Sequence, residues 1–448
     1  MPDNPEKYSS TQSDRSPSPM GKEKQEERLY SATSPQKDTS AQSDHTPSPV
    51  GGGGRGEGAA GQPVGGWSLL LRELRRLATQ PIYIFCMVVA PLFCYYFFTS
   101  LMKEGLPESL PMGLVDEDHS TTTRNLARNL DAFQMSDIVH EYANVTEARK
   151  AVQKGDIYGF YLIPQGTTKQ AQLQRVPTVS FYTNNSYLVA GSLLYRDMRM
   201  MSELASGAAT RTVLYAKGAT EGQAMAYLQP IVIDMHATNN PWLNYSIYLS
   251  NIIIPGMLGI FIFMTTVYSL GSELKFGTAD DLMHQANDSI IAALGTKLLP
   301  QTILFLLMGS IYVLLLYGYL HFPCNCGIPR MWSVMALFVL ACQGLGVFMF
   351  TMLPTLRMGL SFASLWGVIS FSISGMSFPV MAMHPILQGL SYLFPLRLYY
   401  LLYVNCALDG YPLSNALPFV TGMVCFMMLP IPFLGRLKKV MKTYAYEP

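Results

Sequence analysis

The sequence predicts a polytopic α-helical membrane protein, with six transmembrane helices and an inserted extracytoplasmic α/β domain. Of its 448 residues, 14% are charged and 49% are hydrophobic, whereas a soluble protein has about 25% charged residues. The charges gather in the N-terminal tail and one middle block, which leaves long stretches without Asp, Glu, Lys or Arg. A net charge of +1 gives no basic excess, so the composition also excludes nucleic acid as a partner.

Six charge-free stretches are long enough to cross a bilayer, whose core of about 30 Å needs about 20 apolar helical residues. The expected spans are residues 81–102, 243–270, 298–320, 331–356, 358–378 and 410–435. After residue 378, Pro379, Pro385 and Pro395 interrupt the pattern. We expect short helices at the outer interface there, because proline breaks helices. A seventh span over residues 383–402 is the alternative.

The orientation follows from the short flanks of the spans, because basic residues accumulate on the cytoplasmic side. The basic residues next to the first and last spans are Arg72, Arg75, Arg76, Arg436, Lys438, Lys439 and Lys442. Both termini are therefore expected in the cytoplasm, and residues 103–241 on the opposite side.

Residues 1–66 are expected to form a disordered polar tail and Gly-rich linker, because they contain few large apolar groups. Within them, QSDRSPSPMG at residues 12–21 recurs as QSDHTPSPVG at residues 42–51. The tail is either a variable solvated extension or a docking peptide.

Residues 67–80 are expected to form an amphipathic helix. The apolar residues at helical spacing are Trp67, Leu70, Leu71, Leu74 and Leu77. A basic amphipathic helix just before a span is expected to lie in the inner membrane interface. The alternative is a flank that serves insertion alone.

Residues 103–241 read as an α/β domain, because strand and helix patterns alternate. The expected strands are 112–115, 138–141, 157–163 and 178–182, and the expected helices are 121–130, 146–154 and 188–217. Asp116, Glu117 and Asp118 could bind a cation or be solvated acids at a strand end. We find no catalytic constellation and no His spacing typical of a metal site.

The six expected spans have no Asp, Glu, Lys or Arg at their centres, so side-chain coupling to an ion gradient is disfavoured. The chain also lacks a Gly-x-x-x-x-Gly-Lys-Ser/Thr loop for nucleotide phosphates. Any ATPase that drives it is therefore another chain. Ser372, Ser374 and Ser377 lack the Gly-x-Ser-Gly context of an intramembrane protease, so we expect them to pack helices.

Residues 271–289, between the second and third spans, form the longest connection on the cytoplasmic side. Thr278 followed by Asp281 is a capping-box pattern and predicts a short helix from about residue 279, capped by Thr278. Glu273 and Lys275 precede this helix. The segment is either a helix that a partner protein contacts or a plain solvated loop.

Several motifs, in order around the six spans, resemble those of the permease subunits of ABC-type 2 exporters. The matching residues are Glu273 to Thr278 (Glu-x-x-x-Gly-Thr), Gly295-Thr296-Lys297, Ser374-Gly375, Phe378-Pro379, Pro385 and Pro395. Val115-Asp116 and Leu162-Ile163-Pro164 have counterparts in the longer subgroup, which carries a large extracytoplasmic domain between the first and second spans. The resemblance runs from about residue 67 to the C-terminus.

The resemblance implies a permease without enzymatic activity or bound cofactor, which moves a drug-like, lipid or other amphipathic substrate outward across the bacterial cytoplasmic membrane. ATP and Mg would be bound by a partner ATPase. A second copy or a paralogue would complete a dimer, and a periplasmic adaptor protein is a further expected partner. The small residues Ser370, Ser372, Ser374 and Gly375 are candidates for the dimer surface.

The resemblance assigns Glu273, Gly277 and Thr278 to ATPase coupling. Lys275 and Asp281 lie in the same cytoplasmic loop and are further candidates for this role. The residues expected in the outer gate region are Ser374, Gly375, Phe378 and Pro379. The family offers no motif for a substrate site.

The sequence leaves two questions open. The alternative function is a membrane-anchored extracytoplasmic interaction or scaffold protein without transport activity. A disulfide between Cys406 and either Cys324 or Cys326 is also open, because all three are expected outside the cytoplasm.

The topology can be tested by placing a single cysteine at Thr183 in a cysteine-free variant. We expect a membrane-impermeant thiol reagent to label it only from the extracytoplasmic side, because residues 103–241 form the translocated domain. The cysteine-free parent controls for background. Labelling from the cytoplasmic side alone would contradict the topology.

Overall fold

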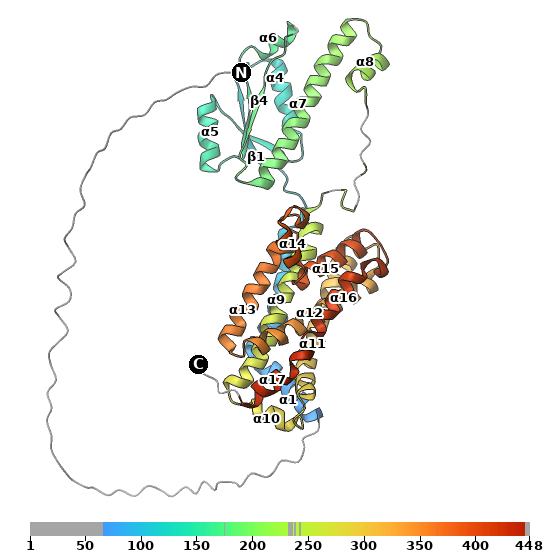
Figure 1. Ribbon diagram of the computed structural model, residues 1–448. Coiled ribbons are helices and arrows are strands. Elements are labelled where there is room, and N and C mark those ends of the chain that lie inside the picture. Colours follow the sequence, from blue (N-terminus) through green and yellow to red (C-terminus); the bar gives the residue numbers. More distant parts are fainter. Residues whose placement is uncertain (1–65, 174, 232–235, 237–238, 242, 444–448) are drawn as a thin grey trace, which may run out of the picture. The chain divides into compact units, whose positions relative to one another are not determined.

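The computed structural model describes residues 66–173, 175–231, 236, 239–241 and 243–443 (Figure 1). Apart from Gly66, the expected disordered tail and its internal repeat lie outside the described residues. All seven cysteines of the chain are described, and all are unpaired thiols.

The described residues contain six helical segments that are long and apolar enough to cross a membrane, which confirms the expected number. The segments are Pro81–Leu101, Tyr245–Lys275, Ile290–Tyr319, Ile328–Met352, Leu356–Ile373 and Leu413–Thr443. The second segment ends five residues later than expected, and the third begins eight residues earlier. The expected spans were stretches without charged residues. Glu273 therefore lay outside the second expected span, and Lys297 lay outside the third.

Three of these segments are composite. The first comprises α2 (Pro81–Ile84), η1 (Phe85–Val89) and α3 (Ala90–Leu101). The second, fourth and fifth are the single helices α9 (Tyr245–Lys275), α12 (Ile328–Met352) and α13 (Leu356–Ile373). The third comprises α11 (Ile290–Val313) and η2 (Leu314–Tyr319). The sixth comprises η5 (Leu413–Ala416), α16 (Leu417–Met428), η6 (Ile431–Phe433) and α17 (Leu434–Thr443).

The alternative seventh span does not form. The prolines divide this region into η3 (Val380–Ala382), α14 (Pro385–Ser391), α15 (Pro395–Tyr403) and η4 (Val404–Leu408). α14 and α15 have seven and nine residues, too few to cross a bilayer. α15 is buried in the helical core, packed against α12 and α16, and is not the surface element that we expected. Its Tyr399 ring lies 5.0 Å from the Phe338 ring.

α9 is the central helix of this part and packs against α12, α13 and α3 (Figure 1). Small residues permit the close approach between α9 and α13. A Cβ atom at Gly367 would lie 2.5 Å from Ile260 Cγ1, and one at Gly256 would lie 2.3 Å from the Phe371 ring. Such contacts hold helices together in lipid, where the hydrophobic effect gives no drive for their association.

The α/β domain contains the four expected strands in the order β2-β1-β3-β4. Its strands are β1 (Leu110–Asp116), β2 (Ser136–Glu141), β3 (Gly159–Ile163) and β4 (Ser180–Thr183). β1 pairs in parallel with β2 and β3, and β4 pairs antiparallel with β3. Its helices are α4 (Thr121–Asp131), α5 (Val145–Lys154), α6 (Thr167–Gln172), α7 (Leu188–Ala216) and α8 (Glu221–Leu228).

Helices cover both faces of this sheet (Figure 1). α4 and α7 bury Leu130, Leu194 and Met198 against one face, and α5 buries Ala148 and Ala151 against the other. The expected helices are confirmed as α4, α5 and α7. The sequence analysis missed α6 and α8, which have six and eight residues and show no apolar period.

The acidic residues after β1 organise the turn to α4. The Asp116 carboxylate accepts the backbone N–H groups of Asp118 and His119 and the hydroxyl of Thr123. The Asp118 carboxylate accepts the backbone N–H groups of Gly166 and Thr168 at 2.7 and 3.2 Å. Hydrogen bonds, first that of the Thr168 hydroxyl, hold the pKa of Asp118 below its usual value. The two carboxylates therefore act as acceptors that fix the turn.

The glycine packing between α9 and α13 predicts the effect of an added methyl group. Gly367→Ala places its Cβ against Ile260, so we expect it to cost about 1–3 kcal/mol and lower the thermal unfolding midpoint in detergent. Gly295→Ala is the control, because a Cβ there meets nothing within 4 Å. Equal midpoints for the two variants would contradict this account of the packing.

Candidate functional site

The candidate site lies where α1 (Gly66–Thr79), the end of α9, α10 (Ala279–Gln285) and the start of α11 meet. α9 and α10 are joined by a turn in which Gly277 has φ +68°. A Cβ at Gly277 would meet nothing within 4 Å, so the backbone conformation alone favours glycine there.

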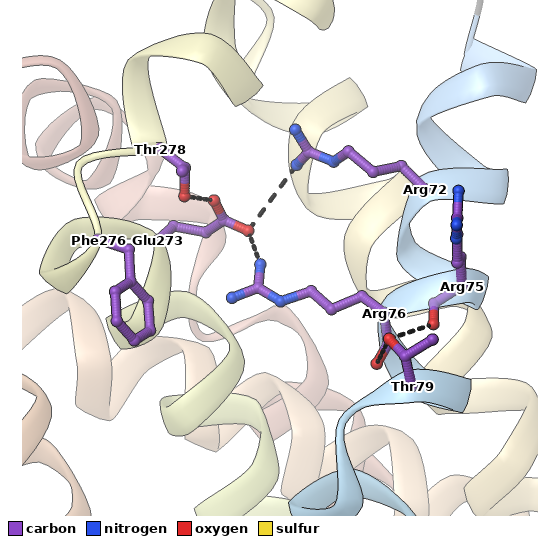
Figure 2. A pocket seen from close by; sticks show the side chains of 7 residues that line it. All are labelled: Arg72, Arg75, Arg76, Thr79, Glu273, Phe276 and Thr278. Atoms are coloured by element: carbon purple, nitrogen blue, oxygen red, sulfur yellow. Dashed lines mark hydrogen bonds and ion pairs between the residues drawn. The ribbon is translucent and has the colours of Figure 1, made fainter.

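The centre of the site is a buried ion cluster. Lys297 Nζ lies 2.6 Å from Glu273 Oε1 and 3.0 Å from Glu73 Oε2. The relative exposure of Lys297 and Glu273 is 0%, and that of Glu73 is 2%. Arg76 donates to Glu273 (Figure 2). It also donates to the Ser272 hydroxyl at 2.9 Å. Each carboxylate is thus paired, as burial of a charge requires.

Arg72 closes the cluster on the side of α10. Its guanidinium lies 3.0 Å from Glu73 Oε1 and 3.8 Å from Glu273 Oε1. It also donates to Gln285 Oε1 of α10 at 3.3 Å. Three cationic side chains thereby face two carboxylates, and the cluster joins α1, α9, α10 and α11.

α1 turns a mixed face of charged and apolar side chains toward the protein. Leu69, Glu73 and Arg76 point inward, whereas Trp67 and Leu71 are exposed. An exposed apolar face is the arrangement expected of a helix that lies in a membrane interface. The structure thus forms the expected amphipathic helix as α1, and the exposed face supports the interfacial interpretation.

Thr278 has a different role from the one that we predicted. α10 does begin at Ala279, with Asp280 and Asp281 in its first turn, but Thr278 makes no capping hydrogen bond. Its hydroxyl donates to the Glu273 carboxylate instead (Figure 2). A buried carboxylate is a stronger acceptor, because hydrogen bonds to charged groups are roughly twice as strong as neutral ones.

The five residues expected to couple to an ATPase therefore divide into two groups. Lys275 and Asp281 are exposed, and Gly277 shapes the turn. Glu273 and Thr278 belong to the internal cluster, so a partner chain does not reach the fully buried Glu273 directly. The exposed surface of the segment also includes Phe276, Asp280 and His284.

The sequence analysis missed the roles of Glu73, Arg76 and Lys297. A signal was present: Glu73 is an acid within a basic helix, and Lys297 is a charge at the start of an apolar helix. Neither local pattern identifies the residue with which the charge pairs, because Glu73 and Lys297 are 224 residues apart in the chain.

The residues expected in the outer gate region lie at the end of α13 and in the turn that follows it. Ser374 is buried, and its carbonyl accepts a hydrogen bond from Arg397 Nη1 at 2.9 Å. Gly375 has φ +96°, and a Cβ there would lie 2.6 Å from Arg397 Nη1. Phe378 and Pro379 are exposed. Arg397 of α15 is thus the main contact of this turn, and the sequence analysis had not assigned it a role.

Not all of the small residues proposed for a dimer surface are exposed. Ser370 and Ser374 are buried within the chain and donate to the carbonyls of Gly367 and Phe371. Ser372 is exposed. The four residues therefore do not form one continuous exposed surface.

Comparison with known proteins gives one match. A family described as "ABC-2 family transporter protein" matches residues 81–433, more than half of the chain. No curated protein matches the chain. The family match does not support the alternative of a scaffold without transport activity.

The ion cluster predicts a large effect of removing its central cation. Lys297→Met leaves Glu73 and Glu273 without their shared partner, so we expect a loss of about 3–5 kcal/mol and a lower unfolding midpoint in detergent. Lys275→Met makes the same chemical change at an exposed position and should stay within about 0.5 kcal/mol of wild type.

The double variant Lys297→Met/Glu73→Gln should recover part of the loss, because it removes a buried carboxylate that has lost its Lys297 contact, while Glu273 keeps its pairing with Arg76. If Lys297→Met unfolds at the same temperature as Lys275→Met, the cluster does not stabilise the fold.

Proposed function

The chain belongs to the ABC-2 family of transporter proteins and is a membrane permease subunit of an ABC transporter, and on this premise we propose that it is an exporter. It moves a drug-like, lipid or other amphipathic substrate out of the cytoplasm or the membrane. A separate ATPase subunit supplies the energy, and that subunit binds ATP and Mg. The family itself implies such an ATPase partner.

The observation that carries this proposal is the ion cluster beside the exposed α10 segment. Thr278, at the start of α10, donates to Glu273 of α9, which pairs with Lys297 of α11. Lys297 also pairs with Glu73 of α1. A displacement of α10 by a partner therefore reaches α9, α11 and α1 through one connected network.

α10 is connected to the sixth span as well. It packs against α17, and Lys442 of α17 lies 2.7 Å from Asp288 in the segment that follows α10. The same small segment thus contacts elements of the second, third and sixth spans. This supports α10 as the element on which an ATPase acts.

The ionisable side chains of the spans are consistent with energy supplied by a separate ATPase rather than by an ion gradient. Glu273 is the only carboxylate in the sequences of the six spanning segments. Lys297, Arg76 and Thr278 all donate to it. A proton-coupled carrier needs a carboxylate or histidine that gains and loses protons within the membrane. A carboxylate held by two cations is poorly suited to that role.

We extend the proposal to the assembly. Two copies, or this chain and a paralogue, form a dimer in the bacterial cytoplasmic membrane, with both termini in the cytoplasm. The α/β domain faces outward and is available to a periplasmic adaptor protein. Ser374, Gly375, Phe378 and Pro379, with Arg397 bound to the Ser374 carbonyl, form part of the outer gate region.

The proposal predicts where an ATPase binds. Phe276 is 64% exposed beside α10, so Phe276→Ala should weaken ATPase binding about tenfold, the usual effect of truncating an aromatic anchor at a protein interface. The measurement is co-purification of the ATPase from native membranes with a tagged permease, beside ATP hydrolysis after reconstitution with substrate.

Phe378→Ala is the matched control, because Phe378 is 52% exposed and lies in the expected outer gate region. It should leave ATPase binding unchanged. If both variants retain the ATPase equally, α10 is not the binding site, and if no ATPase binds the wild-type chain, the proposed function is wrong.

A further inference from the structure

A cationic pocket lies between α1 and the connection from α9 to α10. Its volume is about 370 Å³. The residues that line it are Arg72, Arg75, Arg76, Thr79, Glu273, Phe276 and Thr278 (Figure 2). Three guanidinium groups face a single carboxylate there, so the lining has an excess of two positive charges.

The three arginines differ in how fully they are paired. The Arg76 side chain is 17% exposed and bound to Glu273, and that of Arg72 is 33% exposed and bound to Glu73. Arg75 is exposed, and within the described residues its guanidinium makes no hydrogen bond or ion pair. The pocket therefore offers a cation that no protein carboxylate in this part of the chain neutralises. A guanidinium fork matches the oxygens of a phosphate group.

An apolar surface lies next to this pocket on the same helix. Trp67, Leu71 and Leu74 are exposed and follow one stripe along α1. At about 100° per residue, Arg75 is turned about 70° from the centre of that stripe. α1 therefore presents an apolar face and, on its flank, a cationic pocket. Tryptophan is enriched at membrane–water interfaces, and the first span begins at Pro81, two residues after α1 ends.

We propose that this pocket binds the phosphate headgroup of an anionic phospholipid in the leaflet where α1 lies. The acyl chains run along Trp67, Leu71 and Leu74, and the phosphate is held by Arg75 with the exposed edges of Arg72 and Arg76. The site is distinct from the proposed ATPase contact, although Phe276 borders both. A lipid ligand accounts for both the apolar stripe and the cationic pocket. An acidic side chain of a partner protein accounts only for the cationic pocket.

The test uses the full-length permease in detergent, without any ATPase, and phosphatidylglycerol or phosphatidylcholine as the probe. Native mass spectrometry measures how much lipid stays bound. We expect the wild type to retain phosphatidylglycerol in preference to phosphatidylcholine. Arg75→Gln should weaken phosphatidylglycerol binding about fivefold, the usual contribution of one basic residue at an anionic surface.

Lys439→Gln is the control, because Lys439 is an exposed basic residue of α17 that does not line the pocket. Equal losses for Arg75→Gln and Lys439→Gln would overturn the proposal, because binding would then follow overall charge. Phosphatidylglycerol binding by Arg75→Gln at the wild-type level would overturn the proposal. If the same variant co-purifies less ATPase from native membranes, the pocket instead binds an acidic group of the ATPase.

Inorganic phosphate distinguishes a lipid headgroup from a free anion. We expect it to bind much more weakly than phosphatidylglycerol, and equal affinity would overturn the lipid assignment. Trp67→Ala is a second variant that leaves the pocket intact. It should weaken phosphatidylglycerol binding and leave inorganic phosphate unaffected. A wild-type lipid affinity for Trp67→Ala would show that the apolar stripe does not take part.

Discussion

The pairing of Lys297 with Glu73 and Glu273 is the interaction on which the arrangement of this end of the molecule depends. Three fully buried charges are stable only when they contact one another, because each would lose its solvation without recovering it elsewhere. The pairing therefore requires that α1, α9 and α11 meet. It also turns Glu73 and Arg76 of α1 inward, and so leaves Trp67 exposed on the opposite face.

At the other end of the helical part, a buried network of neutral hydrogen bonds joins the helices. Pro395 starts α15 within the core, and the side-chain amide Oδ1 of Asn251 accepts hydrogen bonds from the hydroxyls of Tyr312 and Tyr317 at 3.2 and 2.7 Å. The hydroxyl oxygens of Tyr312 and Tyr399 are 3.2 Å apart. Neutral hydrogen bonds and close helix packing cost less to rearrange than buried ion pairs. We infer that rigid coupling belongs to the charged end, and that conformational change is easier at the other.

This division suits a permease driven from one side. The ion cluster joins α1 to elements of two spans, α9 and α11, beside the exposed α10. The cationic pocket is lined by Glu273, which is also a member of the cluster. Arg72 and Arg76 belong both to the cluster and to the pocket wall that α1 provides.

The sequence by itself determined the number of spans, because a bilayer requires about 20 apolar residues for each helix. Local patterns also determined the four strands, the end of α5 at Lys154 and the start of α10 at Ala279. Only the tertiary structure decided that Thr278 donates to Glu273 rather than capping α10, and that α15 is a core helix. It alone joined Glu73 to Lys297. A local pattern reports the preferences of neighbouring residues, whereas the pairing of buried charges is decided by helices that are distant in sequence and meet only in the folded chain.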